Sequence, residues 1–70
     1  MTFIKTYEHQ GRTIRAGVIN ARSIDDAVRA SGIKQGVTRS MTNGRVQHLG
    51  VIGTMPAALT EVADAGEKLF

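Results

Sequence analysis

The segment from Ser23 to Gly32, SIDDAVRASG, carries the start, face and stop signals of a helix, and it constrains the fold more than any other stretch. Ser23 is a favourable N-cap residue, and Asp26 three positions later gives an aspartate form of the capping box. Small and apolar residues recur at helical spacing at positions 24, 27, 28 and 31. Gly32 suits the left-handed conformation that ends a helix. We therefore expect a short helix here.

Two β-like runs precede this helix and flank Gln10-Gly11, a pair suited to a two-residue hairpin turn. Such a turn places Tyr7 opposite Ile14 and Phe3 opposite Val18. The predicted core side then holds Phe3, Tyr7, Ile14, Ala16 and Val18, with Lys5 as the one misfit. The opposite side holds Ile4, Thr6, Glu8, Thr13 and Arg15. This polar composition is typical of a sheet covered on one face only.

A second hairpin follows the helix and is centred on Asn43-Gly44, the strongest short-range turn signal in the chain. Its register is open between two alternatives. A two-residue turn pairs Met41 with Val46, whereas a three-residue loop with a bulge pairs Val37 with Leu49.

Residues 54–70 are expected to form a second helix, because Thr54 can cap it, Pro56 suits a first turn and apolar residues recur at helical spacing. The predicted fold class is therefore α+β in a single small domain over residues 1–70. Its element order is ββαββα, a four-stranded antiparallel sheet with two helices on one face.

A winged helix-turn-helix is the alternative fold. Ala27 and Val37 lie ten residues apart, as that motif prefers, and residues 34–48 would form the recognition helix. Gly36 and Asn43-Gly44 make this a poor helix composition, so the hairpin interpretation is favoured.

The chain has 70 residues and no cysteine, so its core is small and has no disulfide to supplement it. We therefore expect a homodimer. No apolar run approaches the roughly 20 residues that cross a bilayer, and the N-terminus does not resemble a signal peptide. These features predict a cytoplasmic protein with no membrane association.

Basic residues gather outside the predicted helices: residues 1–22 and 32–53 hold seven lysines or arginines and only one carboxylate, Glu8. This distribution suits nucleic acid, an acidic host protein or a nucleoprotein as partner. Stacking aromatics are lacking, so phosphate contacts would dominate. The expected contact residues are Lys5, Arg12, Arg15, Lys34, Arg39 and Arg45.

Catalytic and metal-binding patterns are absent from the sequence. His9 and His48 are the only histidines, no metal-ligand spacing occurs, and Asp25 and Asp26 have a sufficient role at the helix start. We therefore expect neither a cofactor nor enzymatic activity.

The layout of a hairpin, the segment NARSIDDAVRAS and a further hairpin around TNG resembles that of small phage-encoded inhibitors of the anti-CRISPR type, over roughly residues 3–52. The resemblance implies a non-catalytic binder of a host nucleoprotein, and it carries over no site residue. The leading hypothesis is a basic binding module acting as a regulator or inhibitor. A winged-helix transcription regulator and a structural oligomerising protein are the alternatives.

Overall fold

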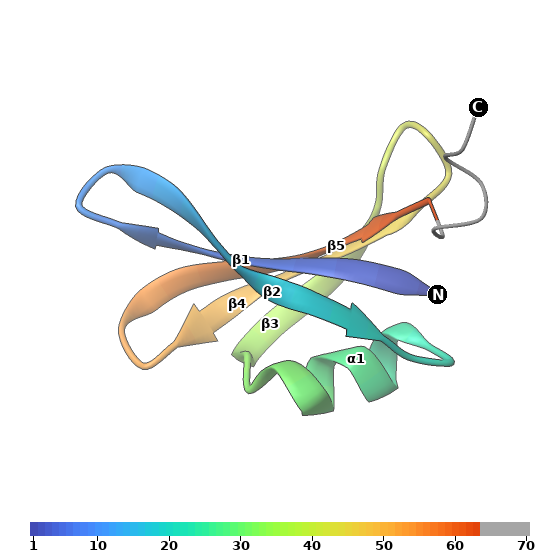
Figure 1. Ribbon diagram of the computed structural model, residues 1–70, viewed down its shortest axis with the longest axis horizontal. Helices are drawn as coiled ribbons and strands as arrows, with labels where there is room; N and C mark the ends of the chain where they lie inside the picture. Colours follow the sequence, from blue (N-terminus) through green and yellow to red (C-terminus); the bar gives the residue numbers. More distant parts are fainter. Residues whose placement is uncertain (64–70) are drawn as a thin grey trace.

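The computed structural model describes residues 1–63, which form one antiparallel sheet with a helix against one of its faces (Figure 1). The strands are β1 (Thr2–His9), β2 (Arg12–Asn20), β3 (Lys34–Ser40), β4 (Val46–Ile52) and β5 (Met55–Val62), and the helix is α1 (Ile24–Ser31). Their spatial order is β2-β1-β5-β4-β3, so β1 and β5 lie side by side in the middle.

The predicted four-stranded sheet with two helices is wrong, because the sheet has five strands and the described residues contain one helix. The winged-helix alternative is wrong as well. Residues 34–48, which would hold its recognition helix, form β3, a loop and the start of β4. The order of the first five elements, ββαββ, agrees with the sequence prediction.

The error lies in β5, which occupies residues predicted to begin a second helix. As a strand, this segment pairs with β1 on one side and β4 on the other. Pairing on both sides outweighs the local helical signals. Pro56 is tolerated because pairing with β1 ends at Ala57, one residue away. Residues 64–70, the rest of the predicted helix, lie outside the described part of the chain.

The first hairpin turns at Gln10-Gly11, as predicted, and pairs Tyr7 with Ile14. Both turn residues have positive φ, 52° and 75°, as a type I′ turn requires. A bulge in β2, opposite Lys5 and Thr6 of β1, then shifts the pairing by one residue. Phe3 consequently lies opposite Ile19, and Val18 is moved from the predicted core side to the other face.

Helix α1 has the ends that its sequence predicts. Ser23 is the N-cap and its hydroxyl accepts a hydrogen bond from the Asp26 amide at 3.2 Å, while Gly32 ends the helix in the left-handed region. Ser31 is buried, and its hydroxyl orients the chain where it leaves the helix. The hydroxyl donates to the Val28 carbonyl at 2.7 Å and accepts from the Ile33 amide at 3.1 Å.

The second hairpin adopts the three-residue-loop register, with Val37 opposite Leu49. The loop closes by hydrogen bonds from the Met41 amide to the Arg45 carbonyl and from the Gly44 amide to the Met41 carbonyl. These bonds are those of a tight turn followed by a bulge.

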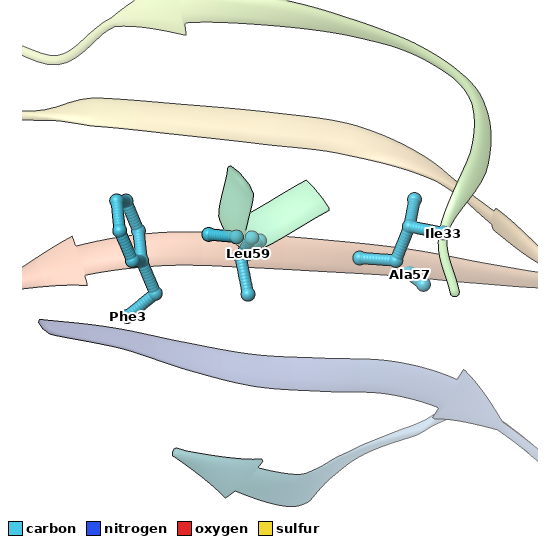
Figure 2. Close-up of a cluster of buried hydrophobic side chains, with 5 residues drawn as sticks. Phe3, Ile33, Ala57 and Leu59 are labelled. Atoms are coloured by element: carbon cyan, nitrogen blue, oxygen red, sulfur yellow. The ribbon is translucent and has the colours of Figure 1, made fainter. Parts of the chain in front are cut away.

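The core lies between α1 and the sheet. Its fully or nearly buried hydrophobic residues are Phe3, Ala27, Ile33, Ala57 and Leu59. Figure 2 shows Phe3 on β1, Leu59 and Ala57 on β5, and Ile33, the residue before β3, following one another along the covered face. Leu59 and Phe3, both at 0% exposure, are the largest fully buried side chains, so the contact between β1 and β5 supplies the centre of the core.

Leu59→Ala is expected to lower the free energy of unfolding by about 2–5 kcal/mol, since it opens a cavity that the sheet and helix cannot close. Urea denaturation followed by circular dichroism measures the loss. Leu59→Met keeps the volume and should lose less than about 1.5 kcal/mol. Equal losses for the two variants would show that Leu59 does not fill a packed core.

Candidate nucleic-acid interface

The sheet has two faces of different character. The covered face packs against α1 and carries Phe3, Leu59 and Ala57. The opposite face, which we term the open face, has no element of the described chain packed on it (Figure 1). The strand registers place on it Thr2, Ile4, Thr6, Glu8, Thr13, Arg15, Val18, Asn20, Lys34, Val37, Arg39, Gln47, Leu49, Val51, Pro56, Ala58, Thr60 and Val62.

One aliphatic residue from each strand contributes to a band across the open face, which we call the aliphatic stripe and which steps by one row between β1 and β5. On β2 and β1, Val18 pairs with Ile4, and on the other three strands Ala58 pairs with Leu49, which pairs with Val37. The two parts are diagonal neighbours, because Ile4 pairs with Thr60 and Ala58 pairs with Thr6. Val18 is 50% exposed and Val37 is 69% exposed.

The positively charged side chains on the open face lie on the two outer strands. Arg15 is on the edge strand β2, and Lys34 and Arg39 are on the other edge strand, β3. The Arg39 guanidinium donates from Nε and Nη2 to Gln47 Oε1, at 3.1 and 2.8 Å. These two bonds hold the guanidinium beside the neighbouring strand β4. Glu8 is the one carboxylate among the open-face residues, and it accepts a hydrogen bond from the Thr13 hydroxyl.

The other carboxylates of residues 1–63 lie on the covered side. Asp25 and Asp26 are in the first turn of α1, and Asp26 forms a 3.0 Å ion pair with Arg29. Glu61 accepts a hydrogen bond from the Val46 amide at 3.1 Å, and its pairing with Phe3 places it on the covered face. Positive charge is therefore in excess on the open side of the sheet.

The six residues predicted to bind a partner do not form one patch. Arg15, Lys34 and Arg39 share the open face, although they are divided between its two edges. Arg12 follows the first turn and Arg45 closes the second hairpin loop, so both lie at ends of hairpins. Lys5 is half-buried on the covered face, between Gly17 and Leu59. The structure thus distributes five of the six cations around the perimeter of the sheet.

Sequence reasoning missed the aliphatic stripe and the role of Gln47. The stripe depends on the bulge in β2, which turns Val18 outward, and on β5, which contributes Ala58. The one available signal was the irregular alternation of apolar residues in both hairpins. Gln47 could be found only from the register, because its contact with Arg39 crosses between strands.

Two shallow hollows lie on the open side. One, of about 140 Å³, lies against Leu49, Pro56 and Ala58. The other, of about 200 Å³, lies against Ile4, Arg15, Val18 and Val62. Each contains a single charged group, Glu8 in the first and Arg15 in the second, beside threonine and aliphatic side chains.

The histidines occupy unrelated positions. His9 is exposed at the end of β1, whereas His48 is buried on β4. His48 Nδ1 lies 2.9 Å from the Thr38 hydroxyl. A Cβ at Gly36 would lie 2.3 Å from His48 Nε2, so the absence of a side chain there makes room for the ring. These contacts explain His48 as a packing residue.

Within residues 1–63, no group of three or more histidine and acidic side chains could hold a metal ion. Among the helices of the same residues, none is long and apolar enough to cross a membrane. Comparison with protein-family models, with curated proteins and with solved structures gives no match.

Thr38→Val is expected to lower the free energy of unfolding by about 1–3 kcal/mol, because it leaves a nitrogen of a buried imidazole without its partner. Thermal and urea unfolding measure the change. Thr38→Ser keeps the hydroxyl and is the matched control. If valine and serine have the same stability, the bond to His48 contributes nothing to the fold.

Proposed function

We propose that this protein is a non-enzymatic module that binds nucleic acid, free or within a nucleoprotein, through phosphate contacts. The observation that carries the proposal is the separation of charge across the sheet. On the open face Arg15, Lys34 and Arg39 are opposed by Glu8 alone, whereas on the covered side Asp25, Asp26 and Glu61 equal in number the cations Lys5, Arg12 and Arg29. A surface with this asymmetry attracts and orients a polyanion.

The spacing of the cations favours a polymer over a small anion. Arg15 and Arg39 are on strands separated by four inter-strand distances, about 19 Å at 4.8 Å per strand. No single phosphate group reaches both. A nucleic-acid backbone presents a phosphate every few ångströms, so it can meet cations at both edges and at the hairpin ends.

The side chains between those cations favour binding without base recognition. The aromatic residues of the described chain, Phe3 and Tyr7, both lie on the covered face. The open face offers aliphatic and threonine side chains, which do not stack on bases as aromatic rings do. Binding would therefore be weakly dependent on sequence and strongly dependent on salt.

The positions of the titratable side chains favour a protein that acts by binding and not by catalysis. His48 is engaged in packing against Thr38 and Gly36, and each hollow of the open side holds a single charged group. General acid–base chemistry needs titratable groups that converge on one reacting atom. We therefore propose that the protein acts as a regulator or inhibitor by covering the nucleic acid that it binds.

Replacing Arg15 and Arg39 together by glutamine should weaken binding to a fluorescein-labelled 30-base-pair duplex at least tenfold at low salt, because two phosphate contacts are lost. The slope of log K against log salt concentration should become shallower by about 1.8, which corresponds to 0.9 per contact. Fluorescence anisotropy at several salt concentrations measures both quantities.

Arg29→Gln is the matched control, since Arg29 lies on α1 and pairs with Asp26 on the covered side. It should leave the affinity and the salt slope unchanged. Absence of binding by the wild-type protein at low salt, or equal losses for the control and the double variant, would refute the proposal.

A further inference from the structure

We infer that the open face is the contact surface between two copies of this chain, with the aliphatic stripe at its centre. The inference covers the middle of the face and leaves the cations of its edge strands accessible, so in the dimer a nucleic acid would contact these edges without crossing the middle. The two can therefore fail separately.

The composition of the open face is unusual for a solvated face. An antiparallel sheet covered on one side normally directs apolar side chains inward and polar side chains outward. Here every strand also directs an aliphatic residue outward, and these residues are neighbours across all five strands. The most exposed large hydrophobic side chains in the described chain beyond Met1 are Val18, Val37 and Leu49, and all three belong to the stripe.

The covered face alone supplies little buried area. Within residues 1–63, its core has five buried hydrophobic residues, of which Ala27 and Ala57 are small, and the seven further hydrophobic residues packed against them are only partly buried. A chain of 70 residues is in the size range where oligomerisation commonly supplements a small core. Two sheets stacked through their open faces would form a second apolar layer, as in a β-sandwich.

The area of the face is sufficient for a specific dimer. Five strands at about 4.8 Å give a width of roughly 24 Å, and four rows of outward residues at about 6.7 Å occupy roughly 27 Å along the strands. With the charged residues of the rim left in water, each copy would bury roughly 500 Å², and the pair would reach about 1,000 Å², the lower limit for a biological interface.

The centre of the open face has no charge that a partner would need to neutralise, so a second copy can cover it. On the three inner strands, the rows that contain the stripe hold only uncharged residues: Ile4, Thr6, Gln47, Leu49, Ala58 and Thr60. A second copy can therefore cover these rows without burying an unpaired charge. Arg15 and Arg39 are on the outermost strands, where long side chains extend into water. Stacking brings the positive rims of the two copies together, so added salt should strengthen the dimer by screening their repulsion.

Sedimentation equilibrium of the full chain tests the inference. The wild-type protein should be a dimer at about 100 µM, and its dissociation constant should fall as NaCl is raised. Val37→Asp and Val18→Asp, on opposite edges, should each raise the dissociation constant at least tenfold, because each buries a carboxylate in the contact. Thr42→Asp, in the exposed hairpin loop, is the matched control and should leave it unchanged.

Wild-type protein that is monomeric at this concentration would overturn the inference, as would equal dissociation constants for the stripe variants and the control. Circular dichroism verifies that the variants fold. Should either aspartate variant unfold, amide chemical shifts of the wild-type protein followed on dilution decide the matter. Changes confined to residues of the open face support the contact, and changes confined to α1 exclude it.

Discussion

The pairing of β1 with β5 is the interaction on which the rest of the structure depends. It joins the hairpin of β1 and β2 to the three strands that follow the helix, and an isolated two-stranded hairpin is marginally stable in water. The same pairing brings Phe3 beside Leu59, the two largest fully buried side chains. Helix α1 then covers the face that this contact creates, and its small Ala27 allows close approach.

The central pairing also determines how charge and apolar surface are distributed. With β1 and β5 inside, the outer strands are β2 and β3, which carry Arg15, Lys34 and Arg39. The inner strands leave an uncharged centre on the open face. A face with an aliphatic centre and a basic perimeter can serve two contacts at once, one between copies of the chain and one with a polyanion.

Local elements were predictable from the sequence, and non-local ones were not. The caps of α1 and the turn at Gln10-Gly11 depend on residues within a few positions, and both were predicted correctly. The bulge in β2 and the strand β5 depend on partners distant in the sequence, and both were missed. The basic residues of the candidate interface could be named in advance, but their placement could not, because it follows from the strand order and from the register that the bulge sets.

Hydrogen exchange of the β5 amides, measured residue by residue by NMR, tests the central pairing most directly. In an inner antiparallel strand, successive amides bond to the two neighbours in turn, so all of residues 57–61 should be protected to nearly the free energy of global unfolding. Amides of the edge strand β3 should alternate between slow and fast exchange. Alternating protection within residues 57–61, or exchange as fast as in a helix end, would contradict the account.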